Sequence, residues 1–93
     1  MKKIANYING ALVEPKSGKY FDNIDPSTGK VYSLIPDSGA SDIDEAVEAA
    51  HKAFPEWSGM SIEKRSKFII KLSEGIEKRM DEFVKAESLD NGK

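Results

Sequence analysis

The sequence predicts an α+β fold, in which N-terminal β-hairpins are followed by two amphipathic helices. Short apolar runs separated by turns with Gly and Pro fill the first 40 residues, which is the pattern of hairpins. Beyond them, apolar residues recur every three or four positions to about residue 90, which is the pattern of helices. We therefore divide the single segment 1–93 into a hairpin region (1–40), a first helix with its connection (41–57) and a long second helix (61–90).

Two turn motifs define the hairpins. Asn9-Gly10 lies between apolar runs, and both residues tolerate the positive φ angles of a type I′ turn. A second hairpin is expected from strands at 20–24 and 31–35, joined by Asp25-Pro26-Ser27-Thr28-Gly29. In that turn Pro26 presets φ, and Gly29 permits a left-handed exit.

The first helix has a start signal and a stop signal. Ser41 can cap the free amide groups while Asp44 reaches back, which is a variant of the capping box. Pro55 should end the helix soon after Phe54. Trp57 follows, and we expect it to fill the junction with the second helix.

The second helix is long for a chain of this size. From 61 to about 89 it would span about 42 Å at 1.5 Å per residue, whereas a compact globule of this length is roughly 30 Å across. Gly75 in its middle is either a close packing contact or a tolerated weak position. The helix would overhang its own globule, and its apolar stripe would need another surface to cover it. We therefore expect the isolated chain to self-associate or to unfold in part.

The composition excludes several classes of function. Fourteen basic and 16 acidic residues give a net charge of −2, which offers no footprint for nucleic acid or an anionic membrane. There is no cysteine, so disulfides, thiolate catalysis and Cys-based zinc sites are excluded. No apolar run approaches the roughly 20 residues of a membrane span, and the N-terminus lacks the core of a signal peptide. A cytoplasmic protein is expected.

Individual residues carry little chemistry. No two glycines are two positions apart, so a G-x-G-x-x-G loop is absent, and neither Gly-Lys pair completes a Walker A loop. His51 is the single histidine, and we interpret it as a solvated or partly packed helix residue rather than a catalytic base. Asp90 is unusual, because a carboxylate at a helix C-terminus faces the negative end of the helix dipole. Either that terminus is frayed and solvated, or a cation or a hydrogen-bond donor meets Asp90.

Five motifs follow one another along the chain. They are Tyr7-Ile8-Asn9-Gly10, Asp25-Pro26-Ser27-Thr28-Gly29-Lys30-Val31, Asp42-Ile43-Asp44-Glu45-Ala46-Val47, Trp57, and Glu87-Ser88-Leu89-Asp90-Asn91-Gly92-Lys93. Together they resemble the N-terminal part of an NAD(P)-dependent aldehyde dehydrogenase. The second motif with Tyr32, followed by Ile35-Pro36-Asp37-Ser38-Gly39, is most similar to the branch acting on muconic semialdehydes. The resemblance implies that 1–93 is the N-terminal part of an α/β Rossmann-like fold.

The resemblance also implies a reaction, in which an aldehyde is oxidised to a carboxylic acid with NAD or NADP. In the family a cysteine thiolate attacks the aldehyde, hydride passes to the nicotinamide, and a glutamate activates water. Those residues, the asparagine of the oxyanion hole and the cofactor site lie further along the family's chain. No catalytic or cofactor-binding residue, and no bound NAD or NADP, is therefore expected on 1–93.

One site of the family carries over in part. Several members hold a structural monovalent cation, Na⁺ or K⁺, with two successive backbone carbonyls and an Asp. The resemblance places these ligands at Asn23, Ile24 and Asp90. Hard oxygen ligands suit such an ion, and its charge would relieve the unfavourable position of the Asp90 carboxylate.

Three interpretations follow. The first is an incomplete N-terminal fragment, inactive alone, whose partner is the remainder of an aldehyde dehydrogenase chain. The second is a free-standing interaction module, which buries its apolar stripe by self-association or on a partner. The third, an independent small enzyme, is opposed by the missing nucleophile, metal ligands and phosphate loop.

Overall fold

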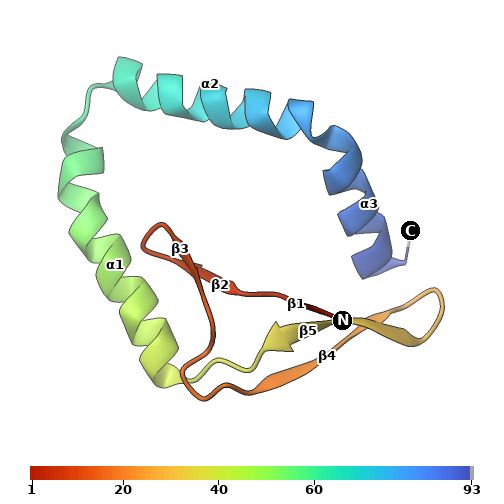
Figure 1. Ribbon diagram of the computed structural model, residues 1–93. Helices are drawn as coiled ribbons and strands as arrows, with labels where there is room; N and C mark the ends of the chain where they lie inside the picture. Colours follow the sequence, from red (N-terminus) through yellow and green to blue (C-terminus); the bar gives the residue numbers. More distant parts are fainter. Residues whose placement is uncertain (93) are drawn as a thin grey trace.

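The computed structural model describes residues 1–92, in which strands occupy one side and three helices form an arc around them (Figure 1). The end of the last helix returns to the turn between the last two strands (Figure 1). The elements are β1 (Lys2–Lys3), β2 (Asn6–Ile8), β3 (Ala11–Val13), β4 (Tyr20–Asp25), β5 (Lys30–Pro36), α1 (Ala40–Gly59), α2 (Ile62–Lys78) and α3 (Met80–Asn91). The predicted α+β class, with strands first and helices after, is confirmed.

The two expected hairpins are both present. β2 and β3 pair antiparallel around Asn9 (φ 52°) and Gly10 (φ 77°), which are the two positive φ angles of a type I′ turn. β4 pairs antiparallel with β5, and β1 adds to the other edge of β5 in parallel, giving the order β1-β5-β4. The short β1 was not predicted, because two consecutive lysines carry no apolar alternation that would mark a strand.

The predicted boundaries of the first helix are wrong at both ends. α1 is capped at Gly39, whose N–H donates to the Asp42 carboxylate at 2.9 Å. Because glycine has no side chain, only this half of a capping box forms, and it uses Asp42 instead of Ser41 and Asp44. The helix also continues through Pro55 to Gly59. Proline removes one backbone hydrogen bond, but its fixed φ of about −65° is itself helical. One further turn can therefore follow Pro55.

The predicted single second helix is also wrong, because the chain forms α2 and α3 with a break at Arg79 (φ −113°, ψ 24°). The Arg79 N–H bonds back three residues to the Ile76 carbonyl at 3.1 Å, which tightens the last turn of α2. The Arg79 side chain then makes two hydrogen bonds to Glu82, of 2.8 and 3.1 Å, in the first turn of α3. The bend directs α3 back towards the sheet instead of letting one straight helix overhang it (Figure 1).

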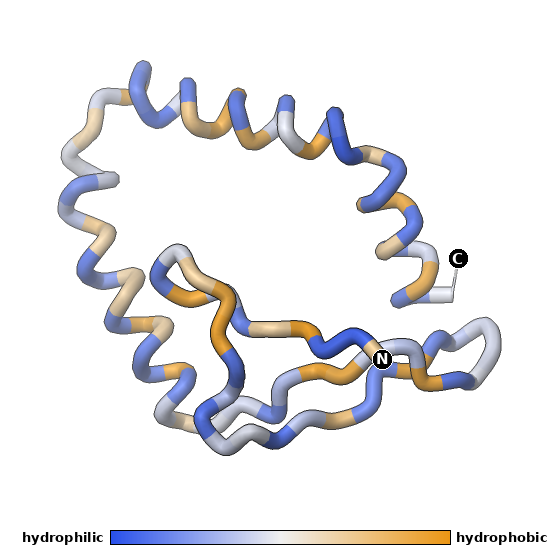
Figure 2. Tube along the Cα trace, in the orientation of Figure 1, coloured by the Kyte–Doolittle hydropathy of each residue, from blue (hydrophilic) through white to orange (hydrophobic). Residues whose placement is uncertain are grey.

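The fold has almost no apolar core of its own. Apart from Pro15 and Pro36, Ile8 is the one buried apolar side chain among the described residues. The radius of gyration is 16.7 Å, against about 12 Å for a compact chain of this length. Figure 2 shows that the apolar sides of α1 and α2 face the strands, yet residues such as Ile69 and Leu72 remain 56% and 60% exposed. The uncovered apolar stripe expected from the sequence is therefore present.

Within residues 1–92, no helix combines the length and the apolar character that crossing a bilayer requires.

Candidate functional site

The turn between β4 and β5 is fixed by its own residues. The Asp25 carboxylate, which is buried, accepts hydrogen bonds from the Ser27 hydroxyl (2.7 Å) and the Ser27 N–H (2.8 Å). These bonds hold the pKa of Asp25 below its usual value, and the bond from the Ser27 hydroxyl has the larger effect. Gly29 (φ 71°) donates its N–H to the Asp25 carbonyl at 2.8 Å and leaves the turn in the left-handed conformation. The sequence prediction for this turn is confirmed.

A β-bulge next to this turn gathers polar side chains on one face of the sheet. Asn23 pairs with Ser33 and Ile24 with Val31, so Tyr32 is an extra residue on β5. Without a bulge, Tyr32 and Ser33 would point to opposite faces. Here the Asn23 amide nitrogen donates to both hydroxyls, to Tyr32 at 2.9 Å and to Ser33 at 3.0 Å.

Asp90 at the end of α3 meets this cluster. The Tyr32 hydroxyl donates to Asp90 Oδ1 at 2.9 Å, and the Asn23 amide nitrogen lies 3.5 Å from the same oxygen. Burial, followed by the bond to Asp90, raises the pKa of Tyr32. A donor group therefore meets the Asp90 carboxylate, whose position against the helix dipole was unusual in the sequence, although Asp90 itself remains exposed.

The final glycine of the motif closes the contact between α3 and the turn. Gly92 has φ 80° and ends α3, with its N–H bonded to the Ser88 carbonyl at 3.0 Å. A Cβ atom on Gly92 would lie 3.2 Å from Pro26 Cβ and 3.6 Å from the Ser27 nitrogen. Gly92 of the fifth motif thus lies against Pro26 of the second motif, 66 positions earlier in the chain.

The three predicted cation ligands lie in one region of the fold. The structure brings Asp90 to the side chain of Asn23, and Ile24 follows Asn23 in β4. Both hydrogen bonds to Asp90 use Oδ1, and Oδ2 accepts none from residues 1–92. This oxygen lies near β4, where the bulge interrupts the hydrogen-bond pairing with β5. Carboxylate and carbonyl oxygens are the kind of ligand that a hard cation takes. Within residues 1–92, no three His, Cys, Asp or Glu side chains are grouped so that they could hold a metal ion.

Tyr32 is the site residue that sequence reasoning missed. Its contribution depends on the bulge, and strict alternation along β5 would have assigned its side chain to the other face. His51, by contrast, is exposed on α1, as expected for a surface helix residue.

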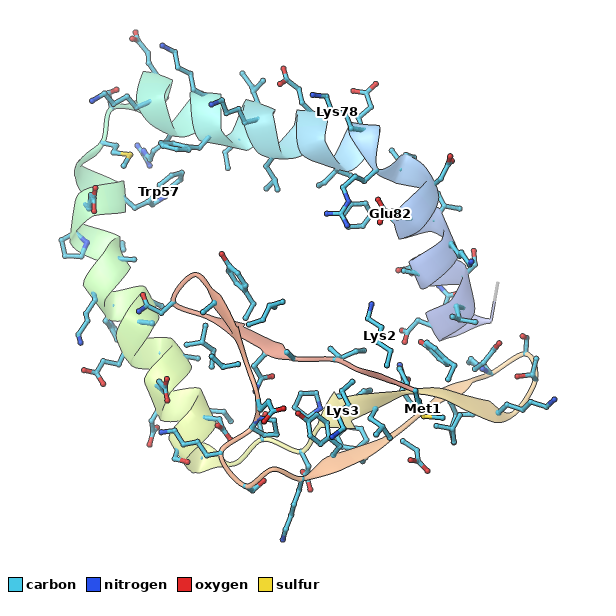
Figure 3. All side chains as sticks on the ribbon, viewed as in Figure 1. Met1, Lys2, Lys3, Trp57, Lys78 and Glu82 are labelled. Atoms are coloured by element: carbon cyan, nitrogen blue, oxygen red, sulfur yellow. The ribbon has the colours of Figure 1, made fainter. Side chains whose placement is uncertain are left out.

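Trp57 fills the joint between α1 and α2, as predicted, although it lies in the last turn of α1 and not in the connection. Its ring is 5.9 Å from that of Phe68, in a tilted arrangement typical of aromatic pairs. Figure 3 shows Trp57 pointing to the inner side of the arc.

Comparison with known proteins shows the family. The model of the aldehyde dehydrogenase family matches residues 12–93. A 2-aminomuconic semialdehyde dehydrogenase of Danio rerio is 51% identical over 90 residues, which cover 97% of this chain and 18% of that protein. A 2-hydroxymuconic semialdehyde dehydrogenase of Pseudomonas sp. (strain CF600) is 39% identical over 94 residues, covering 100% of this chain and 19% of that protein.

Solved structures give the same result. An aldehyde dehydrogenase from Bartonella henselae superposes with a TM-score of 0.91 at 34% identity, over 96% of this chain and 19% of that one. PnpE in complex with nicotinamide adenine dinucleotide superposes with a TM-score of 0.87 at 35% identity, over 96% of this chain and 18% of that one.

The chain belongs to the aldehyde dehydrogenase family, and the resemblance inferred from its motifs is confirmed. It spans less than a fifth of the length of these relatives.

Proposed function

We propose that this chain is the N-terminal structural segment of an NAD(P)-dependent aldehyde dehydrogenase that oxidises a muconic semialdehyde to the corresponding acid. The observation that carries the proposal is that Asp90 of the fifth motif already contacts Tyr32, the residue that follows the second motif, while the apolar sides of α1 and α2 lack cover. In such a segment the end of α3 is already held against the β4–β5 hairpin, but more polypeptide is needed to bury the apolar sides of α1 and α2. The relatives, which are more than five times as long as the matched stretch, contain that polypeptide.

The segment itself contributes no chemistry to the reaction. A thiolate nucleophile is excluded because the sequence has no cysteine. Its function in the enzyme is to pack, through its apolar helix faces, against the part that holds the catalytic and cofactor residues. The substrate class rests on the two muconic semialdehyde dehydrogenases to which the chain is similar.

The decisive test compares the chain alone with a fused enzyme, in which residues 1–93 replace the aligned segment of the Pseudomonas 2-hydroxymuconic semialdehyde dehydrogenase. We expect the fused enzyme to oxidise 2-hydroxymuconic semialdehyde with NAD⁺ or NADP⁺ at a rate within about tenfold of the parent. We expect the chain alone to show no turnover and no saturable heat in a calorimetric titration with either nucleotide.

The opposite results have clear meanings. Saturable nucleotide binding by residues 1–93 alone, or an inactive fused enzyme, contradicts the proposal. Sedimentation of the isolated chain as a rigid, monodisperse monomer would argue that its apolar faces need no cover. A discrete, stable self-assembled oligomer would favour the alternative of a free-standing interaction module.

We propose further that the carbonyls of Asn23 and Ile24 and the Asp90 carboxylate hold Na⁺ or K⁺ in the complete enzyme. In the fused enzyme, replacing Na⁺ and K⁺ by a bulky organic cation at equal ionic strength should lower the thermal midpoint by about 2 to 4 °C, because a ligand that binds only the folded state stabilises it. Asp90→Asn should abolish this difference between salts. Glu87→Gln, which removes the same charge one turn earlier on α3, is the control and should retain it. If replacing Na⁺ and K⁺ changes the thermal midpoint of the fused enzyme and of its Asp90→Asn variant by the same amount, the cation site is refuted.

A further inference from the structure

Arg65 on α2 is half-buried, and its Nε atom is the one buried side-chain donor in residues 1–92 that lacks an acceptor. Its Nε atom is shielded from solvent and makes no hydrogen bond within that part of the chain. A guanidinium stays charged at all ordinary pH values and presents its donors in a fixed fork that suits a carboxylate. Leaving such a donor buried and unpaired is unfavourable. The side chain is therefore placed for an acceptor that residues 1–92 do not supply.

Helix geometry explains why no carboxylate is available locally on α2. On a helix, the residues that can reach Arg65 lie three and four positions away. At this point of α2 all four are uncharged, namely Ser61, Ile62, Phe68 and Ile69. Glu56 in the last turns of α1 lines a different hollow, together with Lys64 and Lys67. The three ion pairs of the described chain involve other residues.

The surroundings of Arg65 form an open apolar groove of about 560 Å³. We call it the Arg65 groove, lined by Trp57, Ile62, Arg65, Ser66, Ile69 and Ile70. Ile62, Ile69 and Ile70 are 73%, 56% and 56% exposed. Trp57 is held in place by its ring contact with Phe68. The groove thus combines an uncovered apolar wall with one cationic side chain.

We propose that the Arg65 groove is a docking surface for a segment that places one Asp or Glu among apolar side chains. We assign that segment to aldehyde dehydrogenase polypeptide outside residues 1–93, so this inference rests on the proposed function. More than four fifths of each relative lies outside the matched stretch, and it provides the required length of chain.

A second copy of the chain fits the groove poorly. A two-fold contact centred on it would bring Arg65 next to the same residue of the other copy. Two like charges desolvated together repel each other, and neither copy supplies an acid there. The charge pattern therefore favours a segment of different sequence.

The test measures thermal unfolding of the fused enzyme with substitutions at Arg65. Arg65→Met keeps the aliphatic length and removes the donors, and we expect it to lower the midpoint by about 5 °C or more. Arg65→Lys keeps the charge but lacks the planar fork, so an intermediate loss is expected. The matched control, Lys67→Met, removes a positive charge from the neighbouring hollow and should shift the midpoint by less than about 1 °C.

A double-mutant cycle identifies the acceptor. Each Asp and Glu outside the first 93 residues of the fused enzyme is replaced by its amide, with and without Arg65→Met. One acid should give a loss that does not add to that of Arg65→Met, because the two side chains share one interaction. Additive losses at every acid, or equal midpoints for Arg65→Met and Lys67→Met, overturn the inference and leave the proposed function intact. An inactive or unfolded parent fusion counts against both.

Sedimentation of the isolated chain provides the second measurement. A dimer that Arg65→Met dissociates would show that a second copy supplies the acceptor, and would overturn the assignment. A dimer that Arg65→Met tightens shows that two copies of Arg65 repel each other at the contact. A dimer that Arg65→Met leaves unchanged does not use the groove, and both results agree with an acceptor on a segment of different sequence.

Discussion

Asp42→Asn should raise the hydrogen-exchange rates of the Lys16 and Gly39 amides by about tenfold, measured by mass spectrometry on peptides of the fused enzyme. Asp42 is 6% exposed, and its two oxygens accept from two separate segments. Oδ2 accepts from the Gly39 N–H at 2.9 Å, which caps α1, and Oδ1 from the Lys16 N–H at 3.1 Å, which ties the loop before β4 to the helix. An Asn side chain replaces one acceptor with an NH₂ group, so one of these N–H groups loses its partner.

The Asp42 carboxylate also makes the stability of the start of α1 depend on pH. The backbone N–H of Gly39, followed by that of Lys16, holds the pKa of Asp42 below its usual value of 3.8. A lowered pKa means that its contribution to stability is complete above pH 3.8 and is lost as the pH falls through the lower value in the folded state. Helicity of the 93-residue chain, followed by circular dichroism from pH 6 to 2, should therefore decrease less on acidification in Asp42→Asn than in the original chain.

Asp44→Asn is the control for both measurements, because Asp44 lies exposed in the same helix. We expect its amide exchange and its acid profile to match those of the unsubstituted chain. If Asp42→Asn and Asp44→Asn behave alike, the hydrogen bonds of Asp42 to the Gly39 and Lys16 N–H groups do not hold the helix start and the loop together.

The turns could be predicted from the sequence because their chemistry is local. Asn9-Gly10 and Pro26 to Gly29 determine their own φ angles, and no distant residue is needed to select the conformation. The cap of α1 could not be assigned in this way. Ser41, Asp42 and Asp44 are all acceptable near a helix start. What favours Asp42 is the Lys16 N–H, 26 residues earlier in the chain.

The break at Arg79 and the bulge at Tyr32 were missed for related reasons. The apolar spacing continues through Arg79, so periodicity alone gives one long helix, while the pairing of Arg79 with Glu82 stabilises a bend. At the candidate site, the position of Asp90 against the helix dipole was a usable signal. The partner Tyr32 depends on a one-residue shift in strand pairing that composition does not encode.

Gly92→Ala and Gly75→Ala should have opposite effects in the fused enzyme. Gly92 has φ 80°, and an added Cβ would lie 3.2 Å from Pro26 Cβ, on a ring that cannot rotate away. The left-handed conformation alone costs a residue with a Cβ about 1–2 kcal/mol. Amides of α3 should therefore exchange about 5 to 30 times faster in Gly92→Ala.

Gly75 sits in the interior of α2, and an added Cβ meets no atom of residues 1–92 within 4 Å. There Ala should stabilise the helix by about 0.5–1 kcal/mol and slow exchange in α2. This comparison separates the two interpretations of Gly75, because the fused enzyme supplies the polypeptide that residues 1–93 lack. If Gly75→Ala instead speeds exchange in α2, the glycine marks a close approach of that polypeptide to the helix. If Gly92→Ala leaves α3 unchanged, the contact between α3 and the β4–β5 turn does not hold the end of the helix, and the placement of Asp90 beside Tyr32 loses its structural support.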